Sequence, residues 1–279
     1  MADAKTRNNK KTRKPANIKD IKLEYLTGKA VDHRTVRNAL GYVGYILLMA
    51  FAFLLVGMAL IMDNNVLRIL FNGVVSLMAL MLFYQNGAVK GTGDVNMGEM
   101  LFEQKKNGHA VGEKEHSACF HPLKGFVISL LGSVPVVICC VALACVATRQ
   151  MTGLGALPTW VSSFEVRSEI GNALMFYHQE VGFQLEDVLR VLVRMSMMPV
   201  VNMVSSYGAD ALLTLERLSA LVLLCPAVAY GLGYMQGVKQ RKLVHLGIIE
   251  GEKKRRKKEK RQRKAQQRQR REKGPQQLN

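Results

Sequence analysis

The side chains with the clearest chemical potential are two arginines that recur at helical spacing in an otherwise apolar stretch. Glu186, Arg190 and Arg194 follow one another at four-residue intervals among Val, Leu and Met residues. This spacing places the three side chains on one face of a helix, where Glu186 and Arg190 can form an ion pair. Because arginine grips carboxylate and phosphate groups with two donors at once, the candidates for an anion or ligand site are Arg190, Arg194, Glu216 and Arg217. Pairing with nearby acidic side chains is the simpler alternative, and such pairs are mostly structural.

Four side chains of metal-ligand type lie in a polar, Gly-rich segment between two apolar spans. They are His109, His116, Cys119 and His121. Imidazole and thiolate groups bind zinc, but the spacing His-x2-Cys-x-His matches no standard zinc pattern. The chain also lacks the common nucleophile, zinc-protease and kinase signatures. The sequence therefore predicts no metal, no cofactor and no enzymatic activity.

The third candidate is a block of positive charge near the C-terminal end. Residues 239–279 hold seventeen Lys and Arg against four acidic residues, and the net charge of the whole chain is +18. Six consecutive basic residues open the block: Lys253, Lys254, Arg255, Arg256, Lys257 and Lys258. Beside a membrane each would attract anionic headgroups with about 1 kcal/mol, and the same charges can neutralise RNA phosphates. No aromatic residue follows Tyr234, so stacking on bases is not expected. In a third interpretation, the basic block serves only to set the orientation of the chain in the membrane.

Apolar segments that are long enough to cross a membrane must position these groups. Four such segments are present, at residues 39–62, 66–84, 125–148 and 218–236. A hydrocarbon core of about 30 Å needs roughly 20 apolar residues per helix. Residues 186–206 are too charged for a simple span, and we expect one amphipathic helix there that lies at the interface or re-enters the bundle. The predicted fold class is an all-α integral membrane bundle of four transmembrane helices plus this helix.

Charge divides the chain into three parts. Residues 1–38 form a basic segment, residues 39–237 the membrane domain, and residues 238–279 a basic tail that is disordered or helical. Within the membrane domain, the sequence predicts a polar loop over residues 85–123. In this loop Asp94 can cap a short helix that ends near Lys106.

Lys and Arg near the ends of the spans predict the orientation. With four spans, both basic ends share one side, so we predict a multi-pass plasma-membrane protein with both termini in the cytoplasm. Residues 149–209 would then face outside. A fifth crossing by residues 186–206 would put one basic end outside. It would also bury two arginines, at roughly 2.5–3.5 kcal/mol each, so we favour four spans.

Small residues line one face of the last span: Ala229, Gly233 and Gly237. Such a ladder lets helix backbones approach closely, either within one chain or between the subunits of a homo- or hetero-oligomer. Together the patterns favour a non-catalytic scaffold, accessory or assembly subunit whose partners include the lipid bilayer. One alternative is a small transporter or transporter subunit with an outer arginine site. The other is a membrane partner of the ribosome or of nucleic acid through the basic tail.

Overall fold

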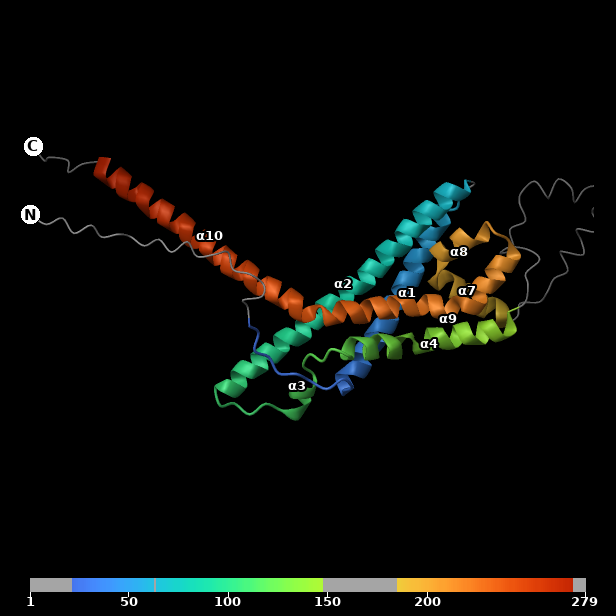
Figure 1. Cartoon of the computed structure of the whole chain (residues 1–279), viewed down its shortest axis with the longest axis horizontal. Coiled ribbons are helices and arrows are strands. Elements are labelled where there is room, and N and C mark those ends of the chain that lie inside the picture. The colour runs from blue at the N-terminus through green and yellow to red at the C-terminus, as the bar shows by residue number, and fades with distance from the viewer. Residues whose placement is uncertain (1–21, 63, 148–184, 273–279) are drawn as a thin grey trace, which may run out of the picture.

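The structure is a computed structural model that describes residues 22–62, 64–147 and 185–272. Every regular element within these ranges is a helix (Figure 1). In chain order the helices are α1 (His33–Ala59), α2 (Asn65–Lys106), α3 (Glu113–Ser117), α4 (Lys124–Val146), α7 (Leu185–Ser196), α8 (Met198–Ser205), α9 (Ala209–Met235) and α10 (Gly237–Glu272). The predictions for residues 1–21, 149–184 and 273–279 lie outside the described residues.

Four of these helices, α1, α2, α4 and α9, are long and apolar enough to cross a membrane. The predictions of an all-helical fold and of four long apolar helices are thus confirmed. Between 17% and 33% of the residues in their most apolar windows are buried. Most of the apolar side chains of the bundle therefore point outward.

α2 is a single helix of 42 residues, so the prediction of a polar loop from residue 85 with a separate short helix after Asp94 is wrong. The second half of α2 buries a stripe of mostly small residues: Gly87, Ala88, Gly91, Val95, Gly98 and Leu101. Spacings of three and four residues put such a stripe on one helical face. Glycine adds little to the hydropathy of a segment. The sequence of this half of α2 is therefore similar to that of a polar loop, although one of its faces is buried.

α2 and α9 cross in close contact through glycines. A Cβ atom on Gly233 would clash with the carbonyl of Tyr84, and one on Gly237 would clash with the backbone of Gly91. Ala229, the third member of the predicted ladder, packs one turn earlier against a buried aromatic cluster. We call this contact of α2 with α9 the glycine crossing. The small residues of the ladder are thus used inside one chain, between helices that are far apart in the sequence.

One end of the bundle gathers the starts of α1 and α4, the ends of α2 and α9, and the first turns of α10 (Figure 1). We call it the basic end. Residues 22–32 run across it without regular structure. The N–H of Leu26 donates to the carbonyl of Gly98 at 3.2 Å, and that of Gly28 donates to the carbonyl of Phe120 at 3.0 Å. The segment before α1 is therefore fixed to α2 and to the segment before α4.

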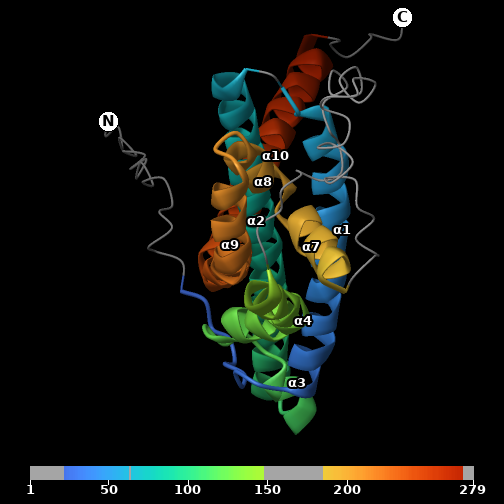
Figure 2. The ribbon, with the colours of Figure 1, turned by 90° about the vertical axis from the view of Figure 1, so that its right-hand side faces the viewer.

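The predicted amphipathic helix is two helices. α7 and α8 meet at Met197 with a bend of 100°, so the prediction of one continuous helix over residues 186–206 is wrong. The backbone of Met197 leaves the helical region at φ −132°, and Pro199 follows in the first turn of α8. Proline has no N–H with which to continue the hydrogen bonds of α7. Figure 2 shows α7 seated between α1 and α9, both of which it contacts.

Candidate functional site

Arg190 and Arg194 come together with Glu216 where α7 packs on α9. Nε of Arg190 donates to Oε1 of Glu216 at 3.0 Å, and Nε and Nη2 of Arg194 donate to the same oxygen at 2.8 and 2.5 Å. Nη2 of Arg190 also donates to Oε1 of Glu186 at 2.6 Å. This second bond is the four-residue pair that the sequence pattern suggests. We call Glu186, Arg190, Arg194 and Glu216 the charge cluster.

The charge cluster is almost sealed from solvent. The exposed fractions of Arg190, Arg194 and Glu216 are 5%, 4% and 2%. Charges at such depth are tolerated when they are paired and hydrogen-bonded. Nη1 of Arg194 is buried without a hydrogen-bond partner among the described residues. The other contacts go to carboxylates of the chain itself, so the geometry fixes α7 against α9.

Arg217 does not belong to the charge cluster. α9 begins at Ala209, well before the predicted start of the span at residue 218, so Glu216 and Arg217 lie inside the helix. Neighbouring residues of a helix point about 100° apart, since 3.6 residues make one turn. Glu216 therefore faces α7, while Arg217 is exposed. The candidate anion site is reduced to Arg190 and Arg194, which together donate three hydrogen bonds to Glu216.

A second buried polar contact, which the sequence did not single out as a site, ties α8 to α1 and α2. Nδ2 of Asn202 donates to the carbonyl of Gly57 at 2.8 Å and to Oδ1 of Asn72 at 3.3 Å. Nδ2 of Asn72 donates in turn to the carbonyl of Arg68 at 2.8 Å. Two features of the sequence could have indicated this contact. Asn202 lies about two turns beyond Arg194, and Asn72 is a lone amide in an apolar run. This amide contact anchors α8, and the charge cluster anchors α7, so the bent pair is held on both sides of the bend.

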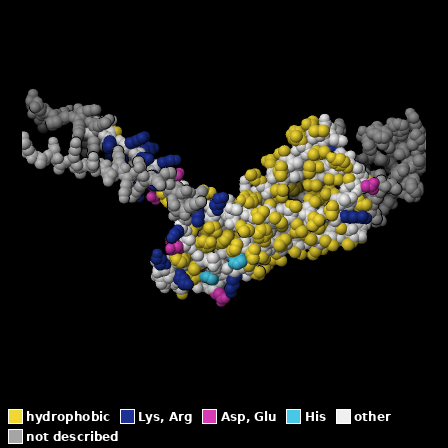
Figure 3. All heavy atoms as spheres, in the orientation of Figure 1, with side chains coloured by type: hydrophobic (Ala, Val, Ile, Leu, Met, Phe, Trp, Pro, Cys, Tyr) yellow, Lys and Arg dark blue, Asp and Glu magenta, His cyan; other side chains and the backbone are white. Residues whose placement is uncertain are grey.

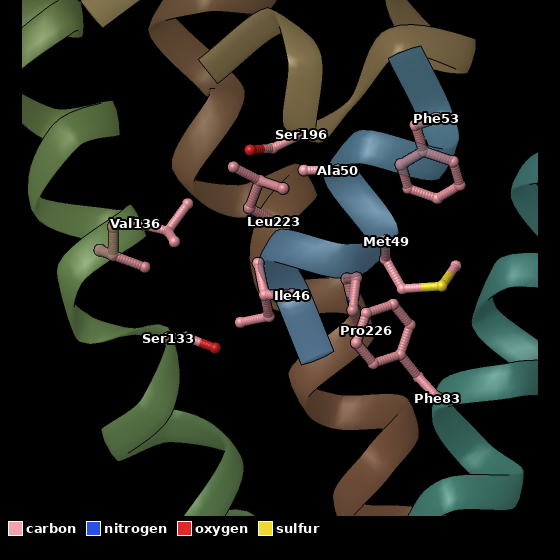
Figure 4. Close-up of a pocket in the computed structure, with 11 residues that line it drawn as sticks. Ile46, Met49, Ala50, Phe53, Phe83, Ser133, Val136, Ser196, Leu223 and Pro226 are labelled. Carbon is pink, nitrogen blue, oxygen red and sulfur yellow. The ribbon is translucent and has the colours of Figure 1, made fainter. Parts of the chain in front are cut away.

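An apolar cavity of about 200 Å³ lies between α2, α8 and α9, with Phe53, Met197 and Pro226 in its lining. A narrower pocket beside it is also lined by side chains of α1 and α4. The side chains labelled in Figure 4 are apolar apart from Ser133 and Ser196. Neither lining includes a residue of the charge cluster. These cavities therefore offer hydrophobic contact rather than an ion path to the arginines.

The four candidate metal ligands all fall within the described residues: His109, His116, Cys119 and His121. Among those residues no group of three or more His, Cys, Asp or Glu side chains is placed to hold a metal ion. The buried thiol of Cys119 donates to the carbonyl of Glu115 at 3.6 Å, and Nδ1 of His121 accepts from the N–H of Leu123 at 3.3 Å. Burial raises the pKa of the Cys119 thiol, which disfavours the thiolate that zinc would need.

Two charged side chains close the basic end, and sequence reasoning missed both roles. Asp94 accepts a hydrogen bond from Oη of Tyr234 at 2.5 Å, which ties α2 to α9. Nζ of Lys124 is buried and donates to the carbonyls of Ala118 and Cys119 at 2.9 and 3.4 Å. Lys124 thus holds the turn before α4. Both contacts hold the bundle together.

α10 leaves the bundle at the basic end and carries the predicted basic block. Nε of Arg241 donates to Oε2 of Glu99 at 2.7 Å, and Nε2 of His245 lies 3.2 Å from Oε1 of Glu99. These contacts dock the first turns of α10 on α2. From residue 247 to residue 267 every side chain is exposed. We call residues 247–272 the basic arm. Its exposed side chains include Lys253, Lys254, Arg255, Arg256, Lys257 and Lys258.

The arm and the bundle have different surfaces. Figure 3 shows the hydrophobic surface concentrated on the bundle and Lys and Arg side chains along the arm. The ion pairs Arg255–Glu259 and Arg256–Glu252 lie along the helix axis and support the arm as a helix. Comparisons of the chain with protein-family models, with curated proteins and with solved structures find no match.

Proposed function

We propose that the chain is a multi-pass membrane protein that acts as a non-catalytic scaffold, with the basic arm as its contact to a polyanionic partner. The outward-facing apolar side chains of α1, α2, α4 and α9 support insertion into a bilayer. A water-soluble monomer rarely exposes apolar patches of more than a few hundred Å². The bent pair α7–α8 fits a re-entrant element that is held inside the bundle.

The distribution of charge supports the orientation that we propose. The basic arm and residues 22–32 lie at the same end of the bundle, together with the lysines at the end of α2, Lys105 and Lys106. Basic residues near the ends of spans favour the cytoplasmic side. In the proposed orientation this end faces the cytoplasm of a plasma membrane. A membrane-impermeant maleimide should then label Tyr207→Cys, at the other end, on intact cells, and should leave Gln262→Cys unlabelled in the same cysteine-free background.

One contrast carries the scaffold proposal. The buried charges of the bundle bind one another, whereas the charges of the arm are exposed over residues 247–267. A block of like charge that is left exposed in this way is a surface for a partner of opposite charge. The bundle then serves to hold this surface at the membrane in a fixed direction.

The transporter alternative has less support. It would gain from a polar cavity that reaches Arg190 and Arg194, but the cavity beside α8 has an apolar lining and both arginines bind Glu216. An enzymatic role would need a nucleophile with a base or a metal site. The described residues hold no candidate metal cluster, and we propose no catalytic role.

Truncation tests the scaffold proposal. A chain that ends at residue 246 keeps Arg241 and His245 on α2 but lacks the arm. We expect this chain to melt at the same temperature as the full chain. On native gels of solubilised membranes we expect larger assemblies with the full chain and none with the truncated chain. Assemblies of unchanged size after truncation would contradict the proposal, because the bundle would then be the contact.

A further inference from the structure

We infer that the basic arm binds double-stranded DNA by lying in the major groove, a proposal that rests on the proposed function of the arm as a polyanion contact. Three properties of the arm lead to it. They are the distribution of charge around the helix, the lack of an apolar face over residues 253–264, and the fixed direction in which the arm leaves the bundle.

Positive charge surrounds the arm on all sides. Residues 253–264 hold ten Lys and Arg side chains and a single acid, Glu259. Six of the ten are consecutive, and steps of about 100° per residue spread six consecutive side chains around the whole helix. One face carries Arg256, Lys260 and Arg263, and the opposite face carries Lys254, Lys258 and Arg261. An arm of this kind offers equal attraction to phosphates on either side of it.

A flat anionic membrane would use only part of this charge. A helix with its side chains is about 10–12 Å across, and the Debye length at physiological salt is about 8 Å. Charges on the side away from a membrane surface would therefore be screened from the headgroups. Helices that bind in the membrane interface also bury an apolar face. Residues 253–264 contain no hydrophobic side chain, and the small residue Ala265 follows them.

A groove between two phosphate strands uses both faces. The major groove of B-form DNA is about 12 Å wide and admits one α-helix, which matches the width of the arm. Residues 253–264 span about 18 Å at 1.5 Å per residue. The deep, narrow major groove of A-form RNA admits a helix less readily. Without aromatic side chains after Tyr234, contact with the phosphates would be independent of sequence.

The docking of the first turns of α10 gives the arm a defined direction. Glu99 holds both Arg241 and His245 against α2. The arm is thus presented as a helix whose start is fixed, and it does not fold back on the bundle over residues 247–267. A partner can therefore bind the arm without first displacing a contact within the chain.

The test uses the full chain in nanodiscs of zwitterionic lipid and fluorescent 20-base-pair duplexes of DNA and of RNA. Fluorescence anisotropy measures the affinity at several salt concentrations. With six or more phosphates in contact, the slope of log K against log salt should be about −5 or steeper. The variants Arg256→Gln/Lys260→Gln/Arg263→Gln and Lys254→Gln/Lys258→Gln/Arg261→Gln should each make the slope shallower by about 2.7. Arg217→Gln, which removes an exposed charge outside the arm, should bind DNA as the unmodified chain does.

Several outcomes would overturn the inference. These are the absence of DNA binding at physiological salt, tighter binding of the RNA duplex, or dependence on one face alone. Recruitment to vesicles with anionic lipid through one face, without DNA binding, would assign the arm to the membrane surface instead. If native-gel assemblies depend on the arm but survive nuclease treatment, the DNA inference fails while the scaffold proposal stands. If truncation leaves the assemblies unchanged although the purified chain binds DNA, the scaffold proposal fails by itself.

Discussion

Replacing Glu216 by glutamine tests the charge cluster directly. Glutamine keeps the shape of the side chain but removes the negative charge to which Arg190 and Arg194 donate three hydrogen bonds. Both guanidinium groups would then stay buried without that partner. Removal of one partner from a buried ion pair costs about 3–5 kcal/mol, because the remaining charge is left uncompensated. We expect Glu216→Gln to lower the free energy of unfolding by that amount.

Thermal unfolding of the purified protein in detergent measures the effect. For chains of 150–250 residues, each kcal/mol shifts the melting temperature by about 2–4 °C, so we expect a decrease of roughly 6–20 °C. The matched control is Arg217→Gln, which also removes a charge from α9, but from an exposed position. Exposed substitutions change stability by about 0.5 kcal/mol or less. If Glu216→Gln melted within a degree of this control, the three-bond geometry at Glu216 would be refuted.

Replacement of the whole cluster separates pairing from ligand binding. Buried ion-pair networks can be exchanged for apolar residues of similar volume at little cost or with a gain. A chain with Arg190→Met, Arg194→Met and Glu216→Leu, together with Glu186→Gln, should therefore regain most of the stability that Glu216→Gln loses. A fully apolar cluster that folds but loses the assemblies on native gels would indicate that the arginines also bind a partner.

Three other substitutions or labels probe the remaining contacts. Gly233→Ala should lower the free energy of unfolding by about 1–3 kcal/mol, because a methyl group overpacks the glycine crossing. The control is Gly41→Ala, where a Cβ atom meets nothing within 4 Å, and it should show no such loss in the same melting assay. Asn202→Ala removes the two buried hydrogen bonds that its amide donates, to the carbonyl of Gly57 and to Oδ1 of Asn72, at about 1–3 kcal/mol. It should increase proteolytic cleavage near α8 more than elsewhere. Cys119 should react with maleimide far more slowly in the folded protein than after denaturation, because burial raises its thiol pKa and blocks access; equal rates near neutral pH would contradict its buried position.

Hydropathy was enough to locate the four long helices because each contains a long run without charge. The same criterion failed for the second half of α2. There the buried face consists of Gly87, Gly91 and Gly98 with few large apolar residues, so the segment looks like a loop. A search for small residues at spacings of three and four would have found a helix that continues to Lys106.

The charge cluster was only partly predictable. Four-residue spacing correctly grouped Glu186 with Arg190, since that contact lies within one helix. The position of Glu216 depends on how α7 packs on α9, and no local pattern encodes that. The bend at Met197 was also missed, although Pro199 two residues later is a known obstacle to a continuous helix. Contacts between distant segments, such as Asn202 with Gly57, need the assembled bundle to become visible.

The glycine crossing has a consequence for biosynthesis. α9 forms the two largest helix contacts of the bundle, with α2 and with α4, yet it is the last of the four long helices to be made. The ribosome adds about 5–20 residues per second, so the glycine face around Gly87 is exposed for roughly 7–30 s before Gly233 exists to cover it. Throughout that interval α1 and α2, and later α4, have no α9 to pack on. The helices of the nascent chain are therefore most exposed to wrong helix contacts in the middle of synthesis. The contacts of α9 and α10 at the basic end form last.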